Sequence, residues 1–361
     1  MKLADKLREK IEIRAKNDSL RSLMLRGNKV DFFSNDYLGV AQLKVEDNEI
    51  SGSTGSRLIS GNSEFTERVE AELAAFFNQE SALLFNAGYD ANLGFFSSVP
   101  QKNDTVLYDQ LIHASVRDGL KMGFAKNYSF KHNDLDDLKK RLKVATGDVY
   151  VAVESIYSMD GDQAPLRALA ALCKEKGLYL IVDEAHSCGI YGQNGKGLVS
   201  DLGLDDSVFA KLVTFGKAYG SHGAAFLGAE DLKTYLLNFA RPIIYSTALS
   251  PHAQNRIIQS VRTVAELSEE RKQLFHNIQL FREAIDERYL MTESNSPIQT
   301  IVLAGNKAAK NMANHIQQNG FAVKAILAPT VAEGSERIRF CIHSFNSEAE
   351  ILELTNCINE S

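Results

Sequence analysis

The chain has 361 residues, of which 44% are hydrophobic, so it can bury a large core and exceeds the usual size of one small domain. Its 40 Lys and Arg and 46 Asp and Glu residues give a formal net charge of −6, and the basic residues are scattered among acidic ones. This balance argues against a nucleic-acid-binding or polybasic membrane surface.

The first 16 residues alternate charged and aliphatic side chains as an amphipathic helix does, and they lack the apolar core of a signal peptide. No later stretch approaches the roughly 18 uninterrupted apolar residues that a membrane-spanning helix needs. We therefore expect a soluble, cytoplasmic protein.

The middle of the chain alternates short apolar runs with helical patterns. The predicted strands are 81–85, 105–108, 149–154, 179–182, 210–215 and 224–228, and the clearest predicted helices are 64–77, 134–142 and 166–176. Strands that alternate with helices predict an α/β fold, with a mostly parallel sheet covered on both faces. Such sheets bind ligands beyond the C-terminal ends of their strands.

The pattern changes near residue 251. A long charged helix is predicted at 253–287 and another at 306–319, with strand-like segments at 297–303, 321–326 and 337–342. This pattern is typical of a smaller α+β domain. We predict an N-terminal helix and arm at 1–40, a large α/β domain at 41–250 and a small C-terminal α+β domain at 251–361.

Four cysteines, Cys173, Cys188, Cys341 and Cys357, stand far apart in the chain. They form no Cys-x-x-Cys pair and have no histidine at zinc-site spacing. We expect reduced, mostly buried thiols and no metal site.

Two segments in the middle of the chain carry candidate chemistry. An apolar strand from Tyr179 ends in Asp183, and His186 follows three residues later. An acid after a strand is also a common helix cap, so this segment alone leaves both interpretations open. The second segment places Lys217 in a loop of small residues, which let the backbone approach a ligand closely, although a single loop lysine is usually just solvated.

Together the two segments indicate pyridoxal-5′-phosphate (PLP) chemistry. A PLP enzyme needs a lysine that forms a Schiff base and an acid that keeps the pyridine nitrogen protonated, and Lys217 and Asp183 supply this pair. The cofactor phosphate needs backbone amides, preferably at a helix N-terminus. The segment 86–92, between a predicted strand and a helical stretch, fits that need.

With these residues, the chain resembles fold-type I PLP enzymes of the α-oxoamine synthase family. The matching segments run from about Phe33 to His343. They are Asn-Asp-Tyr-Leu-Gly at 35–39, Gly-Ser-Thr-Gly-Ser-Arg-Leu-Ile-Ser-Gly at 52–61, Asp-Gln-Leu-Ile-His-Ala-Ser at 109–115, Glu-Ser-Ile-Tyr-Ser-Met-Asp-Gly-Asp at 154–162 and Tyr-Ser-Thr at 245–247. Gly216 departs from the pattern, because most of the family has Ser before the lysine, and the segment between Gly39 and Gly52 is short.

The resemblance implies a role for each matching residue. Lys217 would hold the cofactor and move the Cα proton of the substrate, and Asp183 would pair with the pyridinium. The other cofactor contacts that it implies are Gly88, Tyr89 and Thr214 at the phosphate, His113 stacked on the ring, Ser158 and His186 near the phenolic oxygen, and Ser246 and Thr247 at the phosphate of the neighbouring subunit. Asn35 and Arg339 would meet the substrate carboxylate, for which a guanidinium is well suited.

Several assignments stay open from the residues alone. A lone histidine is more often a satisfied core residue than a cofactor contact, and Asn35 with Asp36 could form an ordinary turn. Arg337 and Arg339 lie two residues apart on a predicted strand and share a face, so only the motif match selects Arg339.

The resemblance also implies the reaction and the assembly. The family condenses an amino acid with an acyl thioester of coenzyme A or acyl carrier protein, and decarboxylation gives an α-amino ketone. Within the family, segment 52–61 is most similar to the 8-amino-7-oxononanoate synthases of biotin synthesis, which use L-alanine and a pimeloyl thioester. Glycine C-acetyltransferase and serine palmitoyltransferase are close alternatives, and an aminotransferase is a more distant one. A non-catalytic scaffold subunit would lack the lysine or the acid, and both are present; we expect a homodimer.

Overall fold

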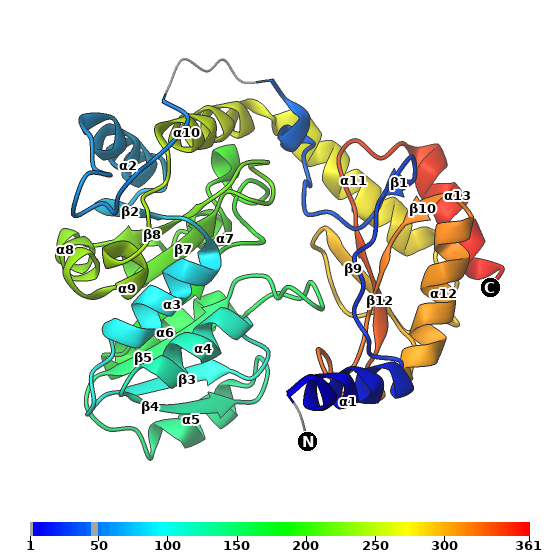
Figure 1. Cartoon of the computed structure of the whole chain (residues 1–361), viewed down its shortest axis with the longest axis horizontal. Coiled ribbons are helices and arrows are strands. Elements are labelled where there is room, and N and C mark those ends of the chain that lie inside the picture. The colour runs from blue at the N-terminus through cyan, green and yellow to red at the C-terminus, as the bar shows by residue number, and fades with distance from the viewer. Residues whose placement is uncertain (1–2, 45–49) are drawn as a thin grey trace. The chain divides into compact units, whose positions relative to one another are not determined.

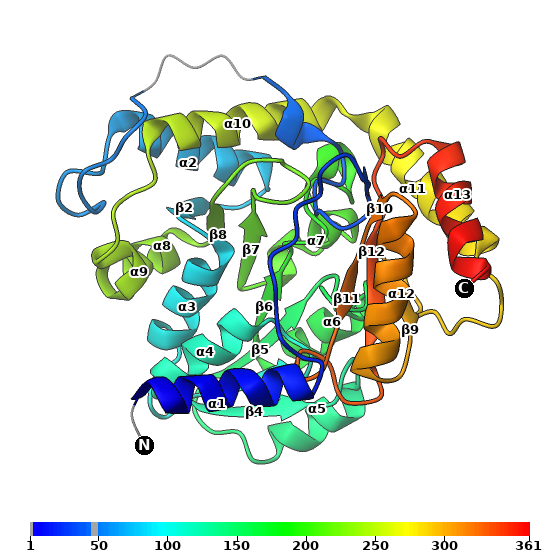
Figure 2. The same ribbon diagram turned by 45° about the vertical axis from the view of Figure 1, so that its right-hand side comes forward.

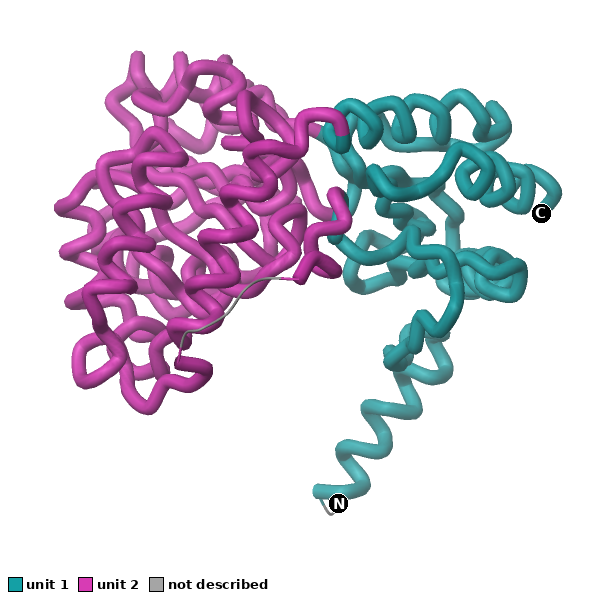
Figure 3. The backbone as a smooth tube through the Cα atoms, turned by 90° about the horizontal axis from the view of Figure 1, so that it is seen from above, with its two compact units in different colours: residues 1–37, 159–162, 270–361 teal, residues 38–158, 163–269 magenta. Residues whose placement is uncertain are grey.

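The computed structural model describes residues 3–44 and 50–361. These residues form two compact units, shown in Figure 3: residues 1–37, 159–162 and 270–361 belong to unit 1, and residues 38–158 and 163–269 belong to unit 2. No helix in the described part of the chain is both long enough and apolar enough to cross a membrane. The domain boundaries expected from the sequence remain a prediction.

Unit 2 is built on a seven-stranded sheet. Its strands are β2 (Ser81–Phe85), β3 (Thr105–Asp109), β4 (Lys126–Phe130), β5 (Val149–Glu154), β6 (Tyr179–Asp183), β7 (Ala210–Thr214) and β8 (Ala224–Gly228), in the spatial order β2-β8-β7-β6-β5-β3-β4. Strand β8 is antiparallel to both of its neighbours, and the other pairings are parallel. The mostly parallel sheet predicted from the sequence is confirmed.

Helices cover both faces of this sheet, as Figure 2 shows. The helices described in unit 2 are α2 (Glu64–Phe76), α3 (Gly88–Ser98), α4 (Ala114–Met122), α5 (Leu135–Leu142), α6 (Leu166–Lys176), α7 (Leu198–Asp201), α8 (Glu230–Phe239), α9 (Arg241–Ile244) and α10 (Pro251–Glu266), with short 3₁₀ turns at Val40–Gln42, Gln193–Gly195 and Asp205–Ser207. Apolar side chains of α3, α4 and α8 share one core with the sheet, which includes Phe95, Val116, Ala152 and Ile181. Helix α6 packs on the opposite face.

The strand directions bring the candidate residues to the same end of the sheet, where these strands end. Because β8 is antiparallel to both β2 and β7, β2 points the same way as β7, and β3, β5 and β6 point that way too. The segments that follow these strands therefore begin at the same edge, where ligands of α/β folds bind.

Unit 1 contains the two termini of the chain (Figure 1). Its elements are α1 (Leu3–Lys16), β1 (Val30–Asp31), most of α11 (Ser268–Ala284), β9 (Ile298–Val302), α12 (Asn306–Gln318), β10 (Phe321–Ala322), β11 (Lys324–Ile326), β12 (Arg337–Cys341) and α13 (Glu348–Asn359). Strands β11, β12 and β9 form an antiparallel sheet, and β1 pairs with β10 in parallel. The predicted α+β character of the C-terminal part is confirmed.

One predicted helix is wrong. The segment 253–287 is not a single helix, because α10 ends at Glu266, and α11 begins at Ser268. Leu267, between them, has a ψ of 54°, which lies outside the helical range. A serine followed by Glu269 and Glu270 favours a new helix start, since acidic side chains stabilise the first turn.

The four cysteines are free thiols. Cys173, Cys188 and Cys341 are buried and Cys357 is half-buried, which confirms the expectation of mostly buried, reduced side chains.

Candidate active site

The candidate site lies at the C-terminal ends of the strands in the sheet of unit 2. Asp183 ends β6 and Glu154 ends β5, and the two residues are register partners on neighbouring parallel strands. Ala152 and Ile181, two residues earlier on these strands, pack in the core with α3 and α4. Because side chains alternate along a strand, both carboxyl groups lie on the α3 and α4 face of the sheet.

Asp183 is only 8% exposed, and each of its carboxylate oxygens has a donor. Oδ1 accepts a hydrogen bond from the backbone N–H of Ala185 at 3.0 Å, and Oδ2 accepts one from Nδ2 of Asn92 at 2.9 Å. Residues 184–190 form no helix, so the interpretation of Asp183 as a helix cap is wrong. The carboxylate is fixed in place by two neutral donors.

His113 is the N-cap of α4, and its ring is held by the first turn of that helix. Nδ1 accepts from the backbone N–H of Ser115 at 3.3 Å and lies 2.7 Å from Ser115 Oγ. Desolvation lowers the pKa of His113, and the nearby Lys217 cation lowers it further, although the charge of Asp183 opposes this. A neutral ring that accepts at Nδ1 carries its proton on Nε2. The residue is exposed, as a ring that stacks on a ligand must be.

A hydrogen-bonded chain links these two residues through side chains that the sequence did not single out. Asn92, buried in α3, donates both to Asp183 Oδ2 and, at 3.0 Å, to Ser115 Oγ, which contacts His113. Asn92 stands three and four residues before Phe95 and Phe96, and this helical spacing to apolar residues was the available signal for its burial. The chain couples the orientation of Asp183 to that of His113.

Lys217 is half-buried in the turn that follows β7. Its carbonyl accepts from Gly220 N–H at 2.8 Å, and a Cβ on Gly220, whose φ is +55°, would stand 2.1 Å from Ala41 N. Only glycine fits this turn. The Lys217 charge acts on the pKa values of both His113 and Glu154, so the three side chains are close enough to interact electrostatically.

The residues expected at a phosphate fit that role. Gly88 is the first residue of α3, and a Cβ there would lie 2.6 Å from Thr214 Cγ2. Thr214 Oγ1 is buried without a hydrogen-bond partner among the described residues. A helix N-terminus beside a buried hydroxyl with bonding capacity to spare is suited to bind a phosphate. The Tyr89 hydroxyl instead donates to Asp118 Oδ2 at 2.5 Å, so a phosphate contact from this residue would come from its backbone.

The other expected cofactor residues fall in the same unit. Ser158 follows β5 and is half-buried, and His186, after β6, is 5% exposed. With Asp183, His113, Lys217, Gly88 and Thr214 they form one set at the strand ends, and these residues fit PLP.

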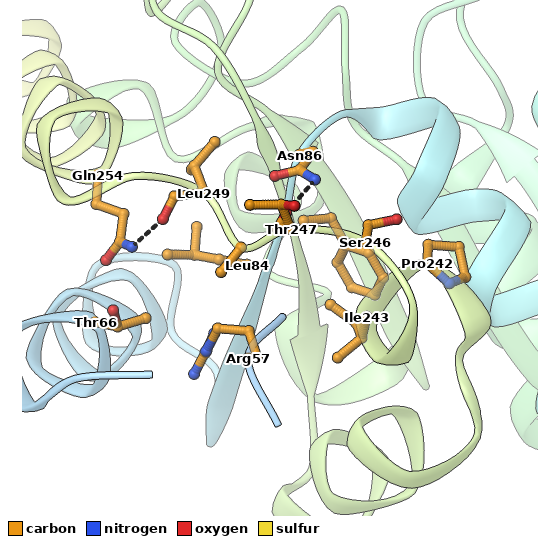
Figure 4. Close-up of a pocket in the computed structure, with 12 residues that line it drawn as sticks. Arg57, Thr66, Leu84, Asn86, Pro242, Ile243, Ser246, Thr247, Leu249 and Gln254 are labelled. Atoms are coloured by element: carbon orange, nitrogen blue, oxygen red, sulfur yellow. Dashed lines mark hydrogen bonds between the residues drawn. The ribbon is translucent and has the colours of Figure 1, made fainter. Parts of the chain in front are cut away.

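Figure 4 shows a small cavity beside Ser246 and Thr247. It measures about 10 Å³, room for about one water molecule. Asn86 Nδ2 donates to the Thr247 carbonyl at 2.9 Å, and Ala248 N–H donates to the Gly55 carbonyl at 2.9 Å. Arg57 lines the same cavity as Ser246 and Thr247, so the segments 52–61 and 245–247, far apart in sequence, lie close together in unit 2.

In unit 1, Asn35 and Arg339 contact each other. Arg339 Nη2 donates to Asn35 Oδ1 at 3.0 Å, and the Tyr37 hydroxyl donates to the same oxygen at 3.1 Å. Arg337 instead forms an ion pair with Asp160 and donates to the Ser335 carbonyl at 2.8 Å. The two arginines, which strand alternation could not tell apart, therefore have different surroundings.

No group of three or more His, Cys, Asp or Glu side chains within 3–44 and 50–361 could hold a metal ion.

Comparisons with known proteins identify the family. A family model described as aminotransferase class I and II matches residues 27–358. The chain belongs to this family. It is 38% identical to 8-amino-7-oxononanoate synthase of Emericella nidulans, over 97% of this chain and 93% of that protein.

Two solved structures are also similar. A serine palmitoyltransferase variant from S. paucimobilis, with a bound PLP–myriocin aldimine, superposes with a TM-score of 0.90 at 26% identity, covering 100% of this chain and 98% of that one. An 8-amino-7-oxononanoate synthase from Francisella tularensis gives a TM-score of 0.78 at 29% identity, covering 92% and 97%. The chain is a PLP-dependent α-oxoamine synthase of the aminotransferase class I and II family, and the predicted fold type I architecture is confirmed.

Proposed function

We propose that this α-oxoamine synthase is an 8-amino-7-oxononanoate synthase. It would condense L-alanine with a pimeloyl thioester of coenzyme A or acyl carrier protein and release carbon dioxide, the free thiol and 8-amino-7-oxononanoate. The observation that carries the proposal is the 38% identity to such a synthase over nearly the whole of both chains. Serine palmitoyltransferase-type activity is the second candidate, because the higher TM-score is with that enzyme.

PLP, when bound, supplies an electron-accepting ring that stabilises negative charge at the α-carbon of the amino acid. Lys217 would bond the cofactor covalently and afterwards move the proton at that carbon. Asp183, whose oxygens are already fixed by Ala185 and Asn92, would keep the pyridine nitrogen protonated. His113 would stack on the ring in its neutral form.

The remaining site residues of unit 2 would hold and orient the cofactor. Ser158 and His186 would bond near the phenolic oxygen, and Gly88, Tyr89 and Thr214 would bind the phosphate through the α3 N-terminus and the Thr214 hydroxyl. The proposed homodimer would bring Ser246 and Thr247 to the phosphate of the partner subunit.

Asn35 and Arg339 would bind the substrate carboxylate. Their mutual hydrogen bond supports Arg339 over Arg337, because Asp160 already neutralises Arg337. In the described structure Arg339 bonds the neutral amide of Asn35, and a guanidinium is suited to bidentate binding of a carboxylate.

The test joins cofactor attachment to substrate choice. Borohydride reduction of the PLP-loaded protein, followed by peptide mapping, should place the adduct on Lys217, and K217A should give none. An adduct on Lys211, the fully buried lysine of β7 that bonds to Asp205 at 2.6 Å, would remove the assignment. With L-alanine and a pimeloyl thioester the protein should release 8-amino-7-oxononanoate; turnover of serine with a long-chain thioester in its place would favour the second candidate.

A further inference from the structure

Glu154 is a buried carboxyl group at the same edge of the sheet to which no role has been given. It is 3% exposed and stands beside Asp183, its register partner on β6. Two carboxyl groups on neighbouring strands and the same face would repel each other if both were ionised. Its position therefore raises the question of whether the Glu154 carboxyl group is ionised or protonated.

The Glu154 carboxyl group interacts with the main chain of two separate segments. Oε2 accepts from the backbone N–H of Ser158 at 3.1 Å, and the backbone N–H of His113 is close enough to lower the pKa of this carboxyl group. His113 and Ser158 are the residues proposed to contact the ring and the phenolic oxygen of the cofactor. Glu154 thus connects both segments to the end of β5.

The other oxygen, Oε1, is buried and has no hydrogen-bond partner among the described residues. An ionised carboxylate would leave a charged, unsatisfied acceptor there, which is costly, whereas a protonated carboxyl group is neutral. The charged groups that act on it agree. Burial and the negative charge of Asp183 raise the pKa of Glu154 to about 8, while Lys217 opposes the rise. The pKa of His113, whose backbone acts on this carboxyl group, is lowered by desolvation.

We infer that Glu154 is a positioning residue that works as a neutral carboxylic acid: it fixes the main chain of His113 and Ser158 and adds no second negative charge beside Asp183. The inference rests on the proposed cofactor site and gives the Glu154 carboxyl group a role in it. Above its pKa, Glu154 would place a second negative charge beside Asp183.

The test compares E154Q with E154A. Glutamine stays neutral at every pH and keeps an oxygen that accepts from Ser158 N–H, so E154Q should bind PLP within about threefold of the wild type. Alanine removes the connection to both segments, and the loss of about one hydrogen bond should weaken PLP binding about tenfold. The wild-type rate should fall as the pH rises through about 8, and the E154Q rate should not show this limb.

A readout without cofactor separates charge from structure. Infrared difference spectra of the apoprotein across about pH 6 to 10 should show a protonated carboxylic acid that ionises, and the band should vanish in E154Q. E184Q is the assignment control, because Glu184 is the other buried carboxyl group of this region whose pKa burial raises. E184Q should leave the Glu154 band in place. Thermal unfolding checks that each variant folds.

The outcomes distinguish this inference from the proposed function. If the wild type fails to bind PLP on Lys217, the cofactor proposal falls. If the wild type binds PLP but E154Q keeps the wild-type pH profile and the infrared band, only the role of Glu154 is overturned.

Discussion

Replacing Asp183 by asparagine tests the central electrostatic element of the site. In the protein, Asp183 Oδ1 and Oδ2 both accept hydrogen bonds, from Ala185 N–H and from Asn92. An amide has only one oxygen, so one of these donors would face an N–H₂ group and the side chain would lose a bond as well as its charge. An opposite charge within about 4–6 Å shifts the pKa of an ionisable group by about 1–3. The protonated fraction of the cofactor's pyridine nitrogen should therefore fall about 10- to 1,000-fold, or about 1.4–4 kcal/mol.

The measurement is kcat together with bound cofactor, read from the visible absorbance. We expect D183N to keep most of its PLP, because Lys217 and the phosphate contacts remain, and to lose at least tenfold in kcat. The matched control is D104N. Asp104 is also 8% exposed and accepts two backbone N–H bonds, from Gln101 and Asp148, but it precedes β3 at the opposite edge of the sheet. D183N turnover within about threefold of the D104N value would refute the reasoning.

Three further outcomes are expected. R339A should weaken L-alanine binding about tenfold or more, since a charge-assisted hydrogen bond contributes about 1.5–3 kcal/mol, and R339K should recover part of it; an unchanged alanine titration would exclude Arg339 as the anchor. Residues Leu3, Leu7 and Ile11 form an exposed stripe on α1, at 73%, 55% and 55%, so L7E/I11E should loosen the proposed homodimer in light scattering at fixed protein concentration, whereas E9K, which leaves the stripe intact, should not. The pKa of Glu154 rises from 4.5 to about 8 on folding, so its stabilisation is complete below about pH 4.5 and is lost as the pH rises through about 8. Across that window the wild type should lose stability relative to E154Q by up to about 1.4 kcal/mol per pH unit in urea unfolding, and parallel curves would contradict the raised pKa.

The parts of the site that the sequence predicted depend on local pattern. An apolar run that ends in Asp183, and a small-residue loop around Lys217, are properties of a few adjacent residues, and the strand-end rule then brings them together. Strand β4 was missed because Lys126, Asn127 and Ser129 give it no apolar run at the edge of the sheet. The break at Leu267 was missed because the helical periodicity continues on both sides of it.

The parts that the sequence did not predict depend on contacts between distant segments. Asn92 and Asp183 are 91 residues apart, and neither local sequence indicates that the two side chains form a hydrogen bond. The same holds for Arg339 and Asn35, which are 304 residues apart. Local patterns identified the chemistry-bearing residues, and the fold decided which neutral side chains orient them.

The departure of the chain from its family at Gly216 illustrates how the two kinds of information combine. Gly216 is exposed, and a Cβ built there would meet no atom closer than Ser221 O at 3.7 Å, so the backbone does not require glycine at this position. The missing serine therefore removes a hydroxyl without reshaping the loop that carries Lys217. Thr214 Oγ1, buried without a described partner two residues earlier, and the N-terminus of α3 remain as the nearby donors for a phosphate. The proposed binding of the phosphate consequently depends on Thr214 and Gly88 more than the family motif alone would indicate.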